Sequence, residues 1–376
     1  MKRLLVLKKF LLKSIKRLFD VNVLLYLRYR FTNYRLIISS KHFSKFQKFF
    51  ICKEPWLQYK TEQFDARINK SLNKYSEIIE TSYLYHFKIP VFVEPYFGWL
   101  IYNKNKVIKE SLPYGTSDGT PLPHYILYQR KKVLKVKKAA SIRYNWMNYW
   151  HFYNDILGQL YLLDQSDFDK EIPLIVPENC KMLQYVKEFF NTDFAKKWKW
   201  IFQDKQTKIQ VKEMYVCKTI SNVREHFLFA KTFFIANTDE KLKRRIFITR
   251  SEQRGRYISN YREIIETLES LEIEIIDCDK ITLQEQINLF STANLIVGIH
   301  GAGLTNIIHR YPQSCTLIEI FPPDLIPPHY YWLSRQLGFN YYALPGEYTN
   351  KVSFYVNPAE LQKAILTIKM ANCNQE

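Results

Sequence analysis

Glycine and paired cysteines are scarce in this chain of 376 residues, and several familiar catalytic motifs do not occur in it. The six cysteines show neither a CxxC pair nor a regular spacing, which argues against a zinc site and against a disulfide framework. A reducing compartment therefore fits the chain best. The sequence also contains no P-loop, HExxH or nucleophile elbow, so nothing in it supports an NTPase or a hydrolase.

Acidic residues are almost missing from the first 50 positions, which hold thirteen Lys or Arg side chains and a single acid, Asp20. Residues 236–376 hold fourteen basic and sixteen acidic side chains, so the net charge of +19 lies outside the C-terminal part. A basic end followed by a near-neutral half predicts attraction to an anionic surface. RNA-binding signatures are absent, so we expect no nucleic-acid partner. A non-enzymatic basic protein that binds membranes or nucleic acid is kept as an alternative.

The basic end, MKRLLVLKKFLLKSIKRLF, contains no apolar run longer than four residues, so it resembles neither a signal peptide nor a membrane span. On a helix its leucines and isoleucine form one stripe and its lysines gather opposite. We expect a basic amphipathic helix within 1–45 that lies on an anionic membrane, with packing on the protein itself as the alternative. The expected location is cytoplasmic, peripheral on the inner face of a membrane.

The length suggests two domains after this segment, at 46–235 and 236–376. The first contains helix-like stretches at 61–82 and 148–163. In the second, strand-like and helix-like stretches alternate, which predicts a parallel, doubly wound sheet that binds ligands at the carboxyl ends of its strands. The strands expected in the first domain are 90–93, 173–176 and 210–216, and those in the second are 245–249, 273–276, 295–299, 316–321 and 340–344. The helices expected in the second domain are 261–271, 282–292, 303–309 and 328–337.

Three of the ten glycines lie close together in IVGIHGAGLTNIIH, residues 296–309, where a predicted strand ends and a helix begins. Their spacing fits neither the dinucleotide fingerprint nor a P-loop. Glycine permits close backbone approach, the helix start offers N–H groups, and His300 can donate to phosphate. Upstream, FITRSEQRGRYISN supplies Arg250, Arg254 and Arg256 at another strand end, and arginine suits phosphate. Together these features predict a diphosphate cradle, although a tight turn and a solvated basic face are simpler explanations for each alone.

Four segments in a fixed order carry a resemblance: NYWHFYNDILGQL, FITRSEQRGRYISN, TLQEQINLFSTANLIVGIHGAGLTN and LIEIFPP. The chain resembles the family-61 glycosyltransferases, whose signature includes an HGAGLTN turn. Tyr261 departs from the family, which usually has an acid there. The resemblance implies a GT-B fold, an α/β architecture of two Rossmann-like domains facing a cleft. It also implies that 46–235 is the acceptor side, that 236–376 binds the nucleotide-sugar, and that the reaction inverts the sugar without an essential metal.

The same resemblance implies a function and donor contacts. The expected reaction moves a hexose or pentose from a nucleotide-sugar, expected to be a UDP-sugar, to a hydroxyl of a glycan or glycoconjugate in cell-surface polysaccharide biosynthesis. No cofactor beyond the donor is expected. The resemblance assigns Arg250 and Arg256 to the diphosphate. It assigns His300, Gly301, Ala302, Gly303 and Asn306 to the pyrophosphate turn, and Glu319 can take two ribose hydroxyls.

The catalytic base must face the donor from the other domain, and WHFYND offers His151 and Asp155 on one helical face. Either His151 is the base and Asp155 orients it, or Asp155 is the base itself. A competing interpretation rests on two D-x-D patterns, at 277–279 and 167–169. This pattern at a strand end is how metal-dependent GT-A transferases hold a divalent ion, so a GT-A enzyme stays an alternative.

Overall fold

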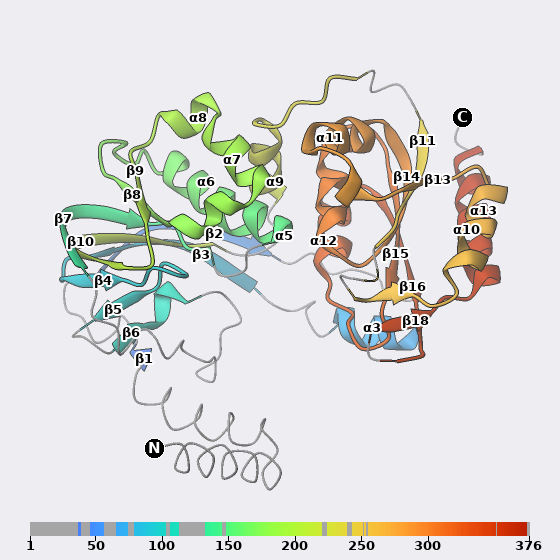
Figure 1. Ribbon diagram of the computed structural model, residues 1–376, viewed down its shortest axis with the longest axis horizontal. Helices are drawn as coiled ribbons and strands as arrows, with labels where there is room; N and C mark the ends of the chain where they lie inside the picture. Colours follow the sequence, from blue (N-terminus) through green and yellow to red (C-terminus); the bar gives the residue numbers. More distant parts are fainter. Residues whose placement is uncertain are drawn as a thin grey trace, which may run out of the picture.

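Two lobes, each built around a β-sheet, form the computed structural model of this chain (Figure 1). The amphipathic helix predicted within 1–45 lies outside the residues that the structure describes, and so does Arg254. The described residues are 37–38, 46–55, 65–73, 79–102, 106–112, 132–144, 148–219, 224–238, 243–250, 252, 255–350 and 352–373.

The first lobe contains a mixed sheet of ten strands, in the order β1-β6-β5-β4-β10-β7-β8-β9, with β3 pairing with β10 and β2. Strands β10, β7, β8 and β9 are parallel, as in a Rossmann-like sheet, whereas β2 to β5 pair with their neighbours in antiparallel fashion. The strands are β1 (Ile37–Ile38), β2 (Phe46–Pro55), β3 (Ile79–Phe87), β4 (Val91–Val93), β5 (Leu100–Tyr102), β6 (Lys106–Ile108), β7 (Lys132–Ser141), β8 (Leu174–Pro177), β9 (Trp200–Gln203) and β10 (Thr207–Lys218).

The helix predicted over 61–82 is wrong in its second half. Helix α3 spans Ala66–Asn73, and β3 already begins at Ile79. Aromatic residues alternate along this strand, and Tyr83 stacks on Tyr85 with ring centroids 5.4 Å apart. Such a period of two suits a pleated strand better than a helix. The three strands predicted in this lobe are confirmed as β4, β8 and β10.

Helices cover one face of the first sheet (Figure 1). The helix predicted over 148–163 is confirmed, but it is interrupted by a π-helical turn, η3, immediately after His151. π-helical turns inside α-helices are rare and are frequent at functional sites. The helical segments of this lobe are η2 (Lys109–Ser111), α5 (Tyr149–His151), η3 (Phe152–Leu157), α6 (Gly158–Gln165), η4 (Glu178–Met182), α7 (Gln184–Phe190), α8 (Asp193–Lys196) and α9 (Arg224–Lys231).

The second lobe confirms the predicted parallel sheet, with strand order β13-β11-β14-β15-β16. Every pair in it is parallel, and β15 is buried along its whole length, which fits its mainly apolar sequence around the buried Glu319. A small sheet, β12-β18-β17, flanks it. The strands are β11 (Arg244–Ile248), β12 (Tyr257–Ile258), β13 (Glu274–Ile276), β14 (Ala293–Ile299), β15 (Thr316–Phe321), β16 (Asn340–Pro345), β17 (Glu347–Tyr348) and β18 (Ser353–Tyr355).

Helices lie on both faces of this parallel sheet, as a doubly wound fold requires (Figure 1). One face packs against α11 and α12, and the other against α10 and α13. Helix α11 begins with a capping box, in which Thr282 and Glu285 satisfy each other's backbone N–H groups. The helical segments are α10 (Tyr261–Ser270), η6 (Cys278–Lys280), α11 (Leu283–Thr292), η7 (Ala302–Arg310), α12 (His329–Gln336) and α13 (Pro358–Cys373).

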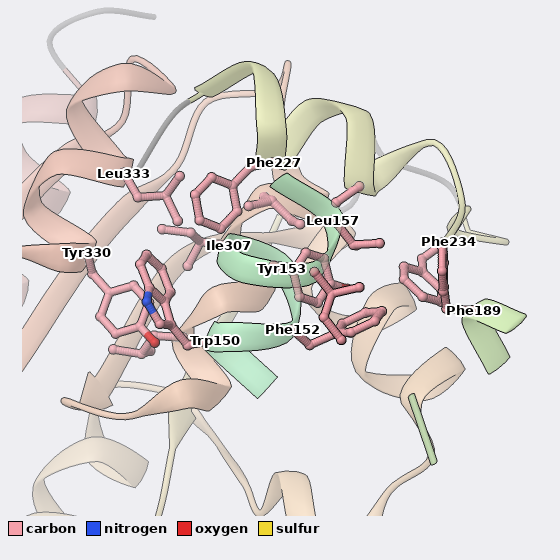
Figure 2. Close-up of a cluster of buried hydrophobic side chains, with 14 of the residues drawn as sticks. Trp150, Phe152, Tyr153, Leu157, Phe189, Phe227, Phe234, Ile307, Tyr330 and Leu333 are labelled. Carbon is pink, nitrogen blue, oxygen red and sulfur yellow. The ribbon is translucent and has the colours of Figure 1, made fainter. Parts of the chain in front are cut away.

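A single hydrophobic core continues from the first lobe into the second (Figure 2). Trp150 lies at the junction, and its ring centroid is 5.2 Å from those of both Phe227 and Tyr330. Tyr149 in the first lobe also donates a hydrogen bond of 2.6 Å to Oδ1 of Asn306 in the second. The segment that begins with α5 therefore packs on both lobes. Among the described helices, none is both long and apolar enough to cross a membrane.

Candidate active site

The order of strands in the second lobe locates the most favourable ligand site. The chain forms β11 first, places β13 on one side of it and then β14 on the other, so the direction of winding changes between β11 and β14. Open α/β sheets bind ligands in the crevice outside the carboxyl ends of the strands at such a switch point. Arg250 follows β11 and His300 follows β14, so the two predicted phosphate-binding motifs meet at this point.

A cavity of about 440 Å³ lies at the switch point, and it is lined from both lobes. The first lobe supplies the α5 segment, and the second supplies the loops that follow β11, β13, β14 and β15. Of the predicted site residues, the structure brings seven to this cavity and leaves three away from its lining. The seven are His151, Arg250, Arg256, His300, Gly301, Ala302 and Gly303, and the three are Asp155, Asn306 and Glu319.

The three clustered glycines serve different purposes. A Cβ atom on Gly301 would lie 2.6 Å from Nη1 of Arg250, so this glycine makes room for the guanidinium. A Cβ on Gly298 would lie 2.7 Å from Cδ2 of Leu304, so this glycine lets η7 pack on β14. A Cβ on Gly303 would meet nothing closer than 3.7 Å, and its backbone faces the cavity. Only Gly303 therefore leaves space for close approach of a ligand, as predicted for the turn as a whole.

The two arginines are held in different ways. Nε of Arg250 donates a hydrogen bond of 2.7 Å to the carbonyl of Gly255, which fixes its guanidinium over Gly301. Arg256 has a φ of +57°, which is unfavourable for a side chain of this size, and partial burial lowers its pKa. Within the described part of the chain, no hydrogen bond or ion pair reaches the Arg256 guanidinium. A strained, unpaired cation at a cavity favours an anionic ligand.

Glu319 does not have the predicted role. Its side chain is fully buried in β15, where Oε1 lies 2.5 Å from Nδ1 of His300 and Oε2 accepts a hydrogen bond of 2.6 Å from Tyr341. Both oxygens are thus committed, and no ribose can reach them. The carboxylate instead fixes the imidazole of His300, with Nδ1–H as the donor to Glu319 and Nε2 as the nitrogen left for the cavity.

The pyrophosphate contact predicted for Asn306 is not possible in this structure either. Asn306 is fully buried in η7, accepts the hydrogen bond from Tyr149 and donates one of 3.0 Å to Oε1 of Gln286. Its side chain therefore connects the turn to α11 and to the first lobe, and it is not available to contact a pyrophosphate. The helix predicted over 303–309 is present as η7, which starts one residue earlier, at Ala302, and is a 3-10 helix throughout.

His151 and Asp155 form a pair on the opposite side of the cavity. Nδ1 of His151 lies 2.9 Å from Oδ2 of Asp155, and Asn154 donates a hydrogen bond of 3.0 Å to the other carboxylate oxygen. Asn148 caps α5 by accepting a hydrogen bond of 3.0 Å from the backbone N–H of His151. The imidazole lines the cavity and the carboxylate does not. The geometry therefore suits His151 for contact with a substrate and Asp155 for orienting it.

His329 and Tyr330 also line the cavity and were not among the predicted site residues. His329 lies at the start of α12, and its ring centroid is 6.5 Å from that of His300. Burial lowers the pKa of His329 to about 3, so this imidazole is neutral at pH 7. Tyr330 lies beside it, with its ring centroid 5.5 Å from that of His300. The signal in the sequence was their position after β15, whose carboxyl end reaches the same edge of the sheet.

The aspartates of the two D-x-D patterns lie in different parts of the structure. Asp277 and Asp279 both lie at the cavity, but Asp277 also caps η6, accepting a hydrogen bond of 3.0 Å from the backbone N–H of Asp279. Within the part of the chain that is described, no three His, Cys, Asp or Glu side chains are grouped to hold a metal ion. Asp167 and Asp169 belong to a turn of the first lobe and do not line the cavity.

Comparison with known proteins identifies the region that carries this geometry. A model of the family described as glycosyltransferase 61 matches residues 149–318. A beta-1,2-xylosyltransferase of Arabidopsis thaliana is 32% identical over 63 residues, which are 17% of this chain and 12% of that protein. The alpha-1,3-arabinosyltransferase XAT3 of Oryza sativa subsp. japonica is 36% identical over 99 residues, which are 25% of this chain and 16% of that protein.

A second rice protein, the alpha-1,3-arabinosyltransferase XAT2, is 28% identical over 144 residues, which are 33% of this chain and 24% of that protein. The aligned parts thus span no more than 24% of the length of these relatives. The family match, in contrast, includes the His151–Asp155 pair, the loop with Arg250 and Arg256, and the glycine turn at 298–303. Residues 149–318 thus match the same family that the sequence motifs predicted.

Proposed function

We propose that this protein is a glycosyltransferase that moves a sugar from a nucleoside diphosphate sugar to an acceptor hydroxyl, with inversion at the anomeric carbon. The observation that carries the proposal is that His151 of one lobe and Arg250, Arg256 and His300 of the other line the same cavity. Two lobes with the site between them also support the GT-B architecture over GT-A. The family match and the transferase names of the relatives support the reaction class.

The second lobe would bind the donor. Arg250 is fixed by Gly255, and Arg256 lacks a counter-ion among the described residues, so both can form charge-assisted hydrogen bonds with diphosphate oxygens. Nε2 of His300, which Glu319 orients through Nδ1, can donate to the same oxygens when the imidazole carries both protons. As the bond from the sugar to the diphosphate breaks, negative charge grows on the leaving oxygen. Fixed cations at that position lower the energy of the transition state, so we propose that no divalent metal is required.

The first lobe would activate the acceptor. His151 accepts the proton of the acceptor hydroxyl while the hydroxyl oxygen forms a new bond to the anomeric carbon. The bond to the diphosphate breaks on the opposite face, and its electron pair leaves with the diphosphate, which inverts the configuration. Asp155 holds Nδ1 of His151 and stabilises the imidazolium that forms, as a positioning residue.

The relatives narrow the choice of sugar. Two are named for xylose transfer or arabinose transfer, so we propose that the donor is a nucleotide-activated pentose, with a UDP-pentose tested first and UDP-hexoses as the alternative. The acceptor would be a glycan or glycoconjugate used in cell-surface polysaccharide biosynthesis. The basic segment 1–45 would hold the enzyme on the cytoplasmic face of an anionic membrane. Loss of vesicle binding on deletion of residues 1–19, with donor binding unchanged, would support that location.

A donor screen tests the proposed function. The full chain is mixed with a panel of nucleotide-sugars in EDTA, and thermal stabilisation is measured together with release of nucleoside diphosphate in the presence of glycan acceptors. We expect one donor class to stabilise the protein and to be consumed without added metal. Activity that is lost in EDTA and restored by manganese would instead favour the metal-dependent alternative through Asp277 and Asp279. Binding of random nucleic acid without binding of any nucleotide-sugar would exclude a transferase.

A further inference from the structure

A second cavity, of about 550 Å³, adjoins the first on the side of β13. The two cavities share Thr249, Arg250 and Asp277, so Arg250 lies at the boundary between them. No role was assigned to this second cavity by the motifs in the sequence. A ligand that places a diphosphate at Arg250 must extend its two ends into these two spaces.

The lining of the second cavity suits a flat, partly apolar group. Isoleucines of β12 and β13 form its walls, and Tyr257 and Tyr261 supply two aromatic rings. Tyr261 is 40% exposed, and its oxygen accepts a hydrogen bond of 3.2 Å from Thr249. Aromatic rings that are exposed or half-buried beside an apolar wall are suitable for stacking on a nucleobase.

Asp277 is placed to bind hydroxyl groups at the boundary. It lies at the carboxyl end of β13, the strand next to β11, and its side chain is 21% exposed. One carboxylate oxygen caps η6, and the other lies 3.5 Å from Nζ of Lys280, a side chain that is 81% exposed. In doubly wound nucleotide-binding folds, an acid at the end of the second strand accepts hydrogen bonds from ribose hydroxyls.

We infer that the second cavity is the nucleoside subsite of the donor, in which Asp277 binds the ribose hydroxyls and the tyrosines hold the base. The inference rests on the proposed function and deepens it. It directs the nucleoside toward β13, away from Glu319, whose buried carboxylate is committed to His300 and Tyr341. The sugar end of the donor then occupies the first cavity, beside His151.

The test compares Asp277→Asn with Asp279→Asn in the full chain. Asparagine caps helices about as well as aspartate, so Asp277→Asn keeps the hydrogen bond to the backbone N–H of Asp279 while removing the charge. Calorimetry measures the affinities for UDP, 2′-deoxy-UDP and inorganic pyrophosphate in EDTA. We expect Asp277→Asn to weaken UDP roughly ten- to a hundredfold, as for a charged hydrogen bond, and to reduce the preference for UDP over its deoxy form. Pyrophosphate affinity should stay unchanged, and Asp279→Asn should resemble the wild type.

A second pair of variants tests the base. Tyr257→Ala should weaken UDP but not pyrophosphate, and Tyr257→Phe, which keeps the ring, should bind UDP as the wild type does. Unchanged UDP affinity in both Asp277→Asn and Tyr257→Ala would overturn the subsite while leaving the transferase proposal intact. Wild-type binding of UDP and pyrophosphate that is absent in EDTA and restored by excess manganese, but not restored in either aspartate variant, would overturn it in favour of a metal site. A wild-type protein that binds neither probe, with or without manganese, would overturn the proposed function itself.

Discussion

Replacing Gly301 by alanine is the most selective way to disturb the site. The added Cβ would lie 2.6 Å from Nη1 of Arg250, whereas its next contact, with the carbonyl oxygen of Ile299, is at 3.6 Å. The backbone at Gly301 is extended, with a φ of 177°, so alanine introduces no backbone strain. Because the group that must move is the end of a flexible side chain, we expect the guanidinium to shift while the fold stays intact.

The size of the effect follows from what Arg250 loses. A displaced guanidinium forfeits about one charged hydrogen bond to the diphosphate, worth about 1.5–3 kcal/mol, which corresponds to roughly a 10- to 150-fold weaker affinity. The melting temperature should change little, since Gly301 is half-buried and the main-chain hydrogen bond between Leu304 and Gly301 does not involve a side chain. Gly301→Ala should therefore weaken diphosphate binding while leaving the melting temperature nearly unchanged.

A double-mutant cycle provides the assay. Affinities for a nucleoside diphosphate are measured by calorimetry for Gly301→Ala, for Arg250→Ala and for the double variant. If alanine at 301 acts by displacing Arg250, the double variant should bind no more weakly than Arg250→Ala alone. Additive losses would refute this reasoning, because they would mean that the methyl group blocks the ligand directly. Gly303→Ala gives the complementary result, since its Cβ fits the protein and any loss there reports contact with the ligand.

Three other predictions concern the base, pH and packing. His151→Ala should lower turnover by about 100- to 10,000-fold, and Asp155→Asn should also lower it, with donor affinity nearly unchanged in both; normal turnover would exclude the pair. Burial lowers the pKa of His226 and of His309 to about 3, below the unfolded value near 6.5. Between pH 6.5 and pH 3 the unfolded chain thus binds more protons than the folded chain. Each of the two histidines should therefore lower the free energy of unfolding by about 1.4 kcal/mol per pH unit as the pH falls through this range. Urea unfolding at pH 7 and pH 5 measures this dependence. If the unfolding free energy of His309→Leu changed with pH as steeply as that of the wild type, the prediction would be contradicted. Trp150→Ala should cost about 3–5 kcal/mol by the same urea assay, and a loss below 1 kcal/mol would show that the lobes do not share a core.

The sequence was sufficient for the second lobe because buried parallel strands leave an unmistakable pattern. Runs such as those of β14 and β15 are mainly apolar, and helix α11 between β13 and β14 begins with a capping box. Arg250 and His300 could be brought together without coordinates because the carboxyl ends of parallel strands share one edge of the sheet. The first lobe was less predictable. Three of its antiparallel strands, β4, β5 and β6, have only three residues each, and β3, along which tyrosines alternate, was predicted as a helix.

The errors within the site have a common physical cause. Glu319 and Asn306 are polar residues in or beside a buried element, and a linear pattern does not reveal whether such a group meets a ligand or another side chain. Their partners, His300 and Tyr341 for Glu319 and Tyr149 for Asn306, come from distant parts of the chain. Asp277 shows the opposite case, since it looked like part of a metal motif and instead lies between two cavities.

A crystal structure of the protein with a nucleoside diphosphate sugar would test the central claim most directly. The account predicts that the diphosphate contacts Arg250 and Arg256, and that the anomeric carbon faces His151 across the first cavity. A donor bound elsewhere, or a diphosphate held by a metal ion on Asp277 and Asp279 with the sugar turned away from His151, would contradict it.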